Sequence, residues 1–89
     1  FLFYFSKQGN VKLVLFSLIN GADVHAQQDD ALRLASENGH LEVVRLLLQY
    51  GADPHVMNNI VFPLAAAHGH LAVVRLLLQY GANLSDEQN

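Results

Sequence analysis

The chain has 89 residues, a formal net charge of -3, five lysines and arginines in total, and no cysteine. Disulfides and thiolate metal sites are therefore excluded, and so few, scattered basic residues argue against a nucleic-acid-binding protein. Polar residues or glycine interrupt every apolar stretch within about ten residues, which is too short for a membrane-spanning helix.

The sequence repeats itself with a spacing of thirty residues. Residues 40–53 reappear almost unchanged as residues 70–83, and a weaker copy occupies residues 10–23. Self-similarity of this kind is typical of a solenoid, in which each unit buries its apolar face only by stacking on its neighbours. We therefore predict one repeat domain over 1–89, with units at about 1–20, 21–50 and 51–80 and a tail at 81–89.

The first unit begins with an aromatic-rich segment over residues 1–5. We interpret residues 1–8 as what remains of a short helix, and residues 11–20 as a long helix. The aromatic residues have three interpretations: core against a preceding unit, a hydrophobic cap, or a partner-binding patch. A capping unit presents a polar outer face, and neither end of the chain has one. We favour packing against further sequence and expect the chain to be a fragment of a longer array.

The second unit has the clearest turn signals. Gly21 follows a helix end, where glycine supplies a positive φ, and the side chain of Asp23 can accept bonds from the turn that follows. The polar residues 27–29 predict a loop. Asp29 or Asp30 is the predicted N-cap of a short helix over 31–38.

A longer helix is predicted over residues 41–50. Its polar residues Glu42, Arg45 and Gln49 form a single stripe. The remaining apolar sides must then be covered by the partner helix and by the units before and after it. The same pattern predicts a long helix over residues 71–80 in the third unit.

The third unit differs at its short helix because it contains Pro63. A proline costs little in the first turn of a helix, whose N–H groups have no internal partner. It nevertheless moves the preceding residue away from helical angles. We therefore predict that this helix starts at Pro63 and is about one turn shorter than its counterpart.

Residues 39–48 and 51–53 resemble the second helix and the following turn of ankyrin repeats, and the resemblance recurs in phase in the third unit. It implies an all-α ankyrin-repeat solenoid of stacked helix-turn-helix units over nearly the whole chain. The usual period is about 33 residues. The period here is thirty, so each unit is shorter than the usual repeat. The residues that it lacks would lie between Ala26 and Asp30, so the hairpin fingers should be short loops. Shortened units of this kind are similar to those in arrays of giant viruses and some intracellular bacteria.

Five histidines raise the question of a metal site. His25 and His55 are equivalent in successive units, as are His40 and His70, but packed helices lie about 8 to 10 Å apart. Imidazoles that share a zinc ion each lie about 2.1 Å from it, and no cysteine or carboxylate cluster supplies the remaining ligands. The resemblance implies that His40 and His70 fill a turn position and bond to the backbone. We therefore predict no metal and no cofactor.

The sequence shows no arrangement of a nucleophile and a base. The glycines are spaced as turn markers and are never clustered as in a phosphate-binding loop. We therefore predict no catalytic residues and a non-enzymatic protein.

The resemblance implies that the short helices and the loop tips line a concave binding face in front of the long helices. The units have similar sequences in their long helices and different residues on this face. At any single position, neutral drift explains the difference equally well. Arg33 and Glu37 are four residues apart, so they can also pair with each other. The predicted partner-binding residues are Arg33, Glu37, Asn38, His68, and the finger residues Gln28, Asp29, Met57 and Asn58.

The leading hypothesis is a module that binds a protein partner, with neither nucleic acid nor a membrane as partner. We expect it in the cytoplasm, or in a host cytosol if the chain comes from a virus or an intracellular bacterium. The alternatives are a structural spacer, a segment that self-associates end to end, or an accessory repeat of a larger protein. The partner itself is not predicted, because one fold hosts many functions.

Overall fold

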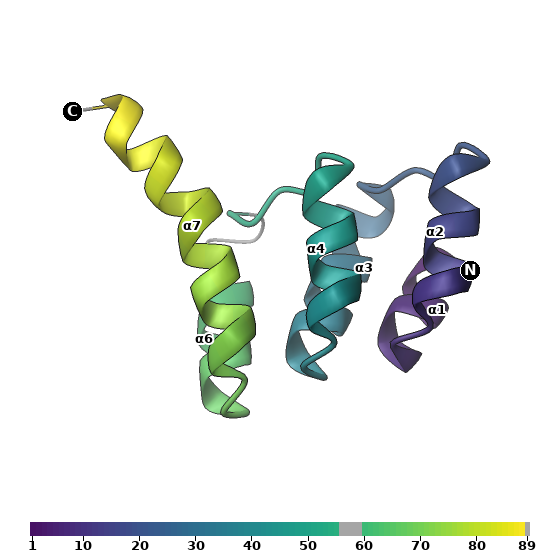
Figure 1. Ribbon diagram of the computed structural model, residues 1–89, viewed down its shortest axis with the longest axis horizontal. Coiled ribbons are helices and arrows are strands. Elements are labelled where there is room, and N and C mark those ends of the chain that lie inside the picture. The colour runs from purple at the N-terminus through teal and green to yellow at the C-terminus, as the bar shows by residue number, and fades with distance from the viewer. Residues whose placement is uncertain (56–59, 89) are drawn as a thin grey trace.

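The computed structural model describes residues 1–55 and 60–88, with side chains described except at residues 27, 28 and 82–88. These residues form helices and no strand (Figure 1). The helices are α1 (Leu2–Gln8), α2 (Val11–Ile19), α3 (Ala26–Glu37), α4 (Leu41–Gln49), α6 (Val61–Ala67) and α7 (Leu71–Gln88).

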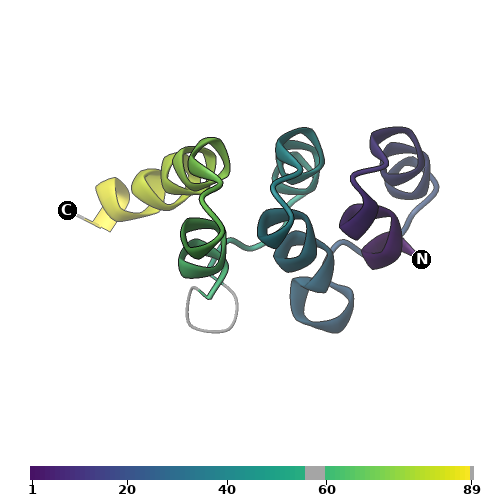
Figure 2. The ribbon, with the colours of Figure 1, turned by 90° about the horizontal axis from the view of Figure 1, so that it is seen from below.

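The helices pair into three units that stack side by side. The pairs are α1 with α2, α3 with α4, and α6 with α7, and the two chain ends lie at opposite ends of the stack (Figure 1). Seen from below, the second helices of the units, α2, α4 and α7, form one layer and the first helices, α1, α3 and α6, form the other (Figure 2). We keep the names long-helix and short-helix layer for them, although α3, with 12 residues, is longer than α2 and α4, with 9 each. The predicted all-α stack of helix-turn-helix units is therefore confirmed.

Five of the six glycines lie at predicted turns and have a positive φ. Gly39, with a φ of 74°, closes the turn between α3 and α4, and Gly51, with a φ of 97°, follows the end of α4. The predicted role of aspartate in the linkers is also confirmed. The backbone N–H of His25 donates to Asp23 Oδ1 over 2.9 Å, and that of His55 donates to Asp53 Oδ1 over 2.8 Å.

Helix α3 begins at Ala26, five residues earlier than predicted, so residues 27–29 belong to a helix and the predicted loop is wrong. The backbone N–H of Ala26 already bonds to the carbonyl of Asp23 over 3.1 Å, so the aspartate turn leads straight into a helical turn. Asp29 then has a φ of 59°. The N-cap residue is His25, not Asp29 or Asp30.

Helix α6 begins at Val61, two residues before the predicted start at Pro63. Pro63 is thus the third residue of the helix, within the first turn, where its missing N–H leaves no internal bond unmade. The proline biases Phe62 against helical angles but does not forbid them. The helix has 7 residues against 12 in α3, so the prediction of a shorter helix is confirmed and that of its start is wrong.

Helix α7 continues to Gln88, so the predicted turn at Gly81 and the predicted separate tail are wrong. Gly81 does not have the positive φ of its counterparts Gly21 and Gly51. A glycine inside a helix costs only about 1 kcal/mol relative to alanine. After Gly51 the chain turns because Ala52 and Pro54 are buried against the rest of the stack.

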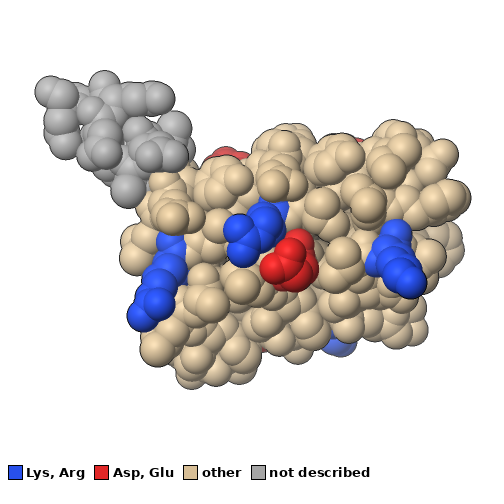
Figure 3. All heavy atoms as spheres, in the orientation of Figure 1, with Lys and Arg blue, Asp and Glu red and all other residues tan. Residues whose placement is uncertain are grey.

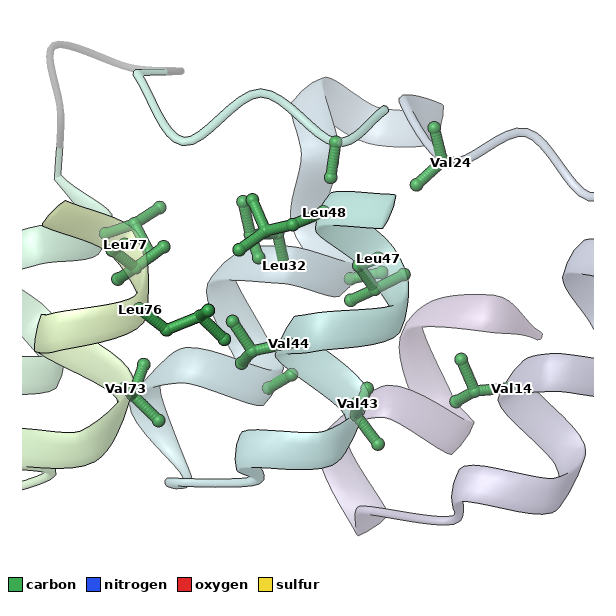
Figure 4. Close-up of a cluster of buried hydrophobic side chains, with 14 of the residues drawn as sticks. Val14, Val24, Leu32, Val43, Val44, Leu47, Leu48, Val73, Leu76 and Leu77 are labelled. Atoms are coloured by element: carbon green, nitrogen blue, oxygen red, sulfur yellow. The ribbon is translucent and has the colours of Figure 1, made fainter. Parts of the chain in front are cut away.

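The core lies between the two layers and runs through all three units (Figure 4). In α4, the helix predicted to be covered on three sides, Glu42, Arg45 and Gln49 are exposed and the prediction of a single polar stripe is confirmed. The side chains that are no more than 1% exposed are Val14, Leu32, Ala35, Val43, Val44, Leu47, Val61, Ala65, Val73 and Leu77, together with Ser6 and Ser36.

Candidate protein-binding face

The short helices pack against one another more closely than the long ones do. Helix α3 contacts α1 and α6 more extensively than α4 contacts α2 and α7. The stack therefore curves, and its short-helix layer lies on the inner side of the curve. This layer is the one in which the sequence places the candidate binding residues.

Each short helix exposes the same four positions on the side away from the core. We call these residues the short-helix surface. They are Phe3, Tyr4, Lys7 and Gln8 on α1, Arg33, Leu34, Glu37 and Asn38 on α3, and Pro63, Leu64, Ala67 and His68 on α6, all of them exposed or partly exposed. The structure thus brings four of the predicted residues, Arg33, Glu37, Asn38 and His68, onto one layer.

Arg33 lies between two carboxylates on α3. Its Nε donates to Asp30 Oδ1 over 2.8 Å, and its Nη1 lies 3.6 Å from Glu37 Oε2. The anticipated pair with Glu37 is present, but the closer pair is with Asp30, at the i, i+3 spacing that the sequence already contained. The side chains of Arg33 and Glu37 are each 31% exposed, so both can be reached from solvent while Arg33 is held in place.

Asn38 and His68 occupy equivalent positions at the ends of α3 and α6. Asn38 Nδ2 donates to the carbonyl of Leu34 over 2.8 Å, and His68 Nδ1 donates to the carbonyl of Leu64 over 2.9 Å. The His68 ring also stacks on His70, with centroids 6.1 Å apart. Both side chains are exposed, and each has its orientation fixed by its own helix.

Of the predicted finger residues, only Asp29 has a described side chain, and it does not lie at an exposed loop tip. Asp29 is only 4% exposed, and its carboxylate accepts a hydrogen bond from His25 Nδ1 over 2.8 Å. The same oxygen lies 3.5 Å from the backbone nitrogen of Asp53, in the following linker. The Asp29 carboxylate therefore contacts both of the segments that join successive units, one at His25 and the other at Asp53. The side chain of Gln28, and both Met57 and Asn58, lie outside the described residues.

The sequence reasoning missed a row of apolar side chains along this surface. Tyr4 is 50% exposed, and its counterparts Leu34 and Leu64 are partly exposed. The signal was present, because the three residues are spaced by one repeat and fall on the exposed side of each helix. Aromatic side chains contribute more binding energy at protein interfaces than most polar ones, so this row belongs to the candidate site.

A comparison with family models identifies the repeats. The model described as ankyrin repeats (3 copies) matches residues 2–88. The chain belongs to the ankyrin-repeat family. A search of the curated proteins found no match. Ankyrin repeats are generally protein–protein interaction modules, and the family is typically non-enzymatic.

Histidines connect successive ankyrin units. His40 Nε2 donates to the carbonyl of Lys7 over 2.8 Å, and its ring lies on Gly9 of the first unit. His70 lies on Gly39 in the same way, so that an added Cβ there would come 2.5 Å from its Nδ1. The predicted backbone bond is thus confirmed for His40. In the described part of the chain, no three histidine, aspartate or glutamate side chains gather as metal ligands.

The opposite face of the ankyrin stack carries one basic residue on each long helix: Lys12, Arg45 and Arg75. Figure 3 shows these charges well separated, with an acidic side chain beside the middle one. Arg45 Nε lies 3.7 Å from Glu42 Oε2, so part of its charge is already compensated. None of the helices, as far as the chain is described, combines the length and hydropathy that a bilayer crossing requires.

Proposed function

We propose that this ankyrin array binds a protein partner along the short-helix surface and carries out no catalysis. The observation that supports the proposal is the contrast within each unit. Three of the four exposed positions of the short helices hold a different side chain in every unit, and the fourth holds Tyr4, Leu34 and Leu64. The long helices behind them are nearly identical in the second and third units. A rigid surface also loses little conformational entropy when it binds.

The three short helices offer a partner different chemistry. The first unit presents the aromatic pair Phe3 and Tyr4 next to Lys7, and the third presents Pro63 and Leu64 beside His68. The middle unit presents the fixed Arg33 with its carboxylates. We infer that the apolar ends contribute most of the affinity and that the middle unit selects the partner by charge, because exposed ion pairs contribute more to specificity than to affinity.

Glu37 is the charged residue best placed to meet a partner. Its oxygen lies 3.6 Å from Arg33, against 2.8 Å for the bond between Arg33 and Asp30, so it can turn toward a basic group without breaking the closer pair. The finger residues Gln28, Met57 and Asn58 remain predicted contacts. Asp29 leaves the proposed contact set, since its carboxylate is buried and bonded internally.

The test compares two tyrosines of similar exposure on opposite layers. Tyr4 is 50% exposed on the short-helix surface, and Tyr50 is 44% exposed at the end of α4. A partner captured by the chain is purified and titrated against Tyr4→Ala and Tyr50→Ala. We expect Tyr4→Ala to weaken binding about tenfold or more, as for an interface aromatic, and Tyr50→Ala to leave it unchanged. Equal effects of the two changes, or no effect of Tyr4→Ala, would refute the proposal.

A further inference from the structure

The short-helix surface carries an exposed or partly exposed apolar side chain at the same position of each unit. These residues are Tyr4 on α1, Leu34 on α3 and Leu64 on α6, and we call them the apolar row. Tyr4 is 50% exposed, and the two leucines are partly exposed. Leu34 belongs to the middle unit, which has a neighbour on each side, so its exposure is a property of the stacked array itself.

A charged flank accompanies the apolar row. Lys7 and Glu37 each follow the apolar residue of their own helix by three positions, so they lie next to it on the helix surface. The third unit has Ala67 at this position. Lys7 is exposed, and Glu37 lies 3.6 Å from Arg33, which Asp30 holds more closely. Along the stack the flank therefore changes from positive to negative to neutral.

The spacing of the apolar row follows from the packing of the short helices, which succeed one another in one layer (Figure 2). The axes of packed helices lie about 8 to 10 Å apart. The row lies on the inner side of the curved stack, where side chains are spaced no more widely than the axes. Its three side chains therefore span about 16 to 20 Å. A partner that contacts all three must present a side chain in the same direction in every interval of about 8 to 10 Å.

Regular peptide conformations differ in how well they meet this requirement. In a β-strand, side chains on one face recur about every 6.6 Å, and the next recurrence is at about 13 Å. In an α-helix, the seventh residue returns to the same side after about 10.5 Å, so two intervals exceed the row, and the curvature increases the mismatch. In a polyproline II helix, every third residue returns to the same side after about 9.3 Å. Of these conformations, polyproline II fits the row.

We propose that the partner contacts the apolar row through an extended polyproline II segment with an apolar residue at every third position. This segment is the contacting part of the protein partner, so the inference rests on the proposed function. Charge complementarity places an acidic residue of the segment beside Lys7 and a basic residue beside Glu37, three positions apart. Such a segment is largely pre-formed, so little ordering entropy opposes binding. Tyr4 adds an aromatic side chain, the kind on which proline-rich segments dock.

The first experiment selects peptides that bind the full chain from a random library. Peptides of about seven residues or more cover the row, at about 3.1 Å per residue. Each selected peptide is then titrated against Tyr4→Ala. We expect those that Tyr4→Ala weakens to share apolar residues at every third position. A shared pattern of every second or every seventh residue would overturn the inference and leave the proposed function intact, whereas a selection without any peptide that depends on Tyr4 would overturn both.

A change of spacing in a selected peptide tests the register. One residue inserted between two of its apolar positions turns the second by a third of a turn and moves it about 3 Å along the row. Binding should weaken roughly 10- to 100-fold, the worth of one large buried apolar side chain. The control carries the same residue added at one end of the peptide and should bind like the original. Equal affinities of the two lengthened peptides would overturn the spacing of three.

A substitution in the middle of the row tests the same contact from the other side. Leu34→Ala should weaken a selected peptide about tenfold or more. The matched control is Leu71→Ala, because Leu71 is 64% exposed on α7, in the opposite layer, and its loss should leave peptide affinity unchanged. A thermal melt shows that both variants are folded. An unchanged affinity of the folded Leu34→Ala chain would overturn the proposed path of the peptide.

A charge exchange tests the flank with a variant that leaves the apolar row intact. Lys7→Glu should weaken a selected peptide about two- to fivefold, as for an exposed ion pair. Replacing the acidic residue of the peptide by lysine should restore the affinity. Lys12→Glu makes the same change of charge on α2, in the opposite layer, and should have no effect. An equal loss for Lys12→Glu, or no restoration by the altered peptide, would overturn the proposed register of the peptide on the row.

Discussion

The two layers of helices differ in how far they vary from one unit to the next. In the long-helix layer, Leu47 and its counterpart Leu77 are fully buried, and the residues around them are nearly the same in both units. In the short-helix layer, the surface positions change class between units, from Phe3 to Arg33 to Pro63. Burial against neighbours on both sides restricts the long-helix layer to a few apolar residue types. Exposure to solvent leaves the residue types of the short-helix surface free to vary.

The comparison also divides each short helix into two sides. Ala35 and Ala65 are fully buried, whereas Glu37 and Ala67, two residues further on, belong to the short-helix surface. In these two units the buried side of the helix therefore holds the same small residue, whereas the side that faces away from the core varies.

The largest expected effect is on the long-helix layer. Leu47→Ala removes a fully buried side chain from the middle unit, and truncations of this kind cost about 2 to 5 kcal/mol. Urea unfolding followed by circular dichroism measures the loss. The control is Leu78→Ala, where the leucine is 53% exposed and the cost should stay within about 0.5 kcal/mol. Similar costs at the two positions would contradict the assignment of the long helices as the buried layer.

The second prediction concerns the contact between units. Gly39→Ala and Gly69→Ala both place alanine at a φ of 74°, a strain of roughly 1 to 2 kcal/mol. Only at Gly39 does the new Cβ meet a neighbour, His70, at 2.5 Å. Displacing that ring should add about 1 to 3 kcal/mol, as overpacking does elsewhere. The difference in unfolding free energy between the two variants isolates the histidine contact, and equal values would show that the ring moves aside without cost.

The parts of the fold that the sequence predicted are those set by local chemistry. The long helices were predicted because their apolar residues recur with a helical period and leave a single polar stripe. The turns were predicted because glycine readily adopts a positive φ. The missed start of α3 depends on hydrogen bonds that the sequence pattern does not reveal, and one polar contact of this segment joins distant residues. Asp29, for instance, is held near the backbone nitrogen of Asp53, which is 24 residues away.

The candidate site was predicted in part for a similar reason. Arg33, Glu37 and Asn38 were found because polar residues on a short helix are expected to be exposed. Tyr4 and Leu34 were missed because an apolar residue on a short helix is indistinguishable from core until the phase of the helix is known. Asp29 was assigned to an exposed loop tip because residues 27–29 are polar and aperiodic, whereas the structure places it in α3, buried and hydrogen-bonded to His25.

The third prediction separates stability from recognition in the middle unit. Arg33→Glu places three carboxylates on one side of α3 and removes the pairs with Asp30 and Glu37. Exposed pairs of this spacing are worth about 0.2 to 0.5 kcal/mol each, so we expect a loss of about 0.5 to 1 kcal/mol of stability. Glu37→Gln keeps the closer pair and should leave the melting temperature unchanged while it alters partner affinity. If Glu37→Gln lowers stability as much as Arg33→Glu does, the carboxylate belongs to the framework and not to the binding surface.

The smallest expected effect lies on the buried side of a short helix. The Ser36 hydroxyl is fully buried and has no hydrogen-bond partner, and the third unit has Ala66 at the equivalent position. Ser36→Ala removes a polar group whose burial is uncompensated and improves helix propensity by a few tenths of a kcal/mol. We expect the free energy of unfolding to rise by up to about 1 kcal/mol. The matched control is Ser17→Ala, which removes a hydroxyl that donates to the carbonyl of Leu13 over 2.8 Å and should bring no such gain. A loss at Ser36 would mean that the hydroxyl helps to hold α3 against α6, and the buried side of the short helices would then require specific polar contacts as well as small apolar residues.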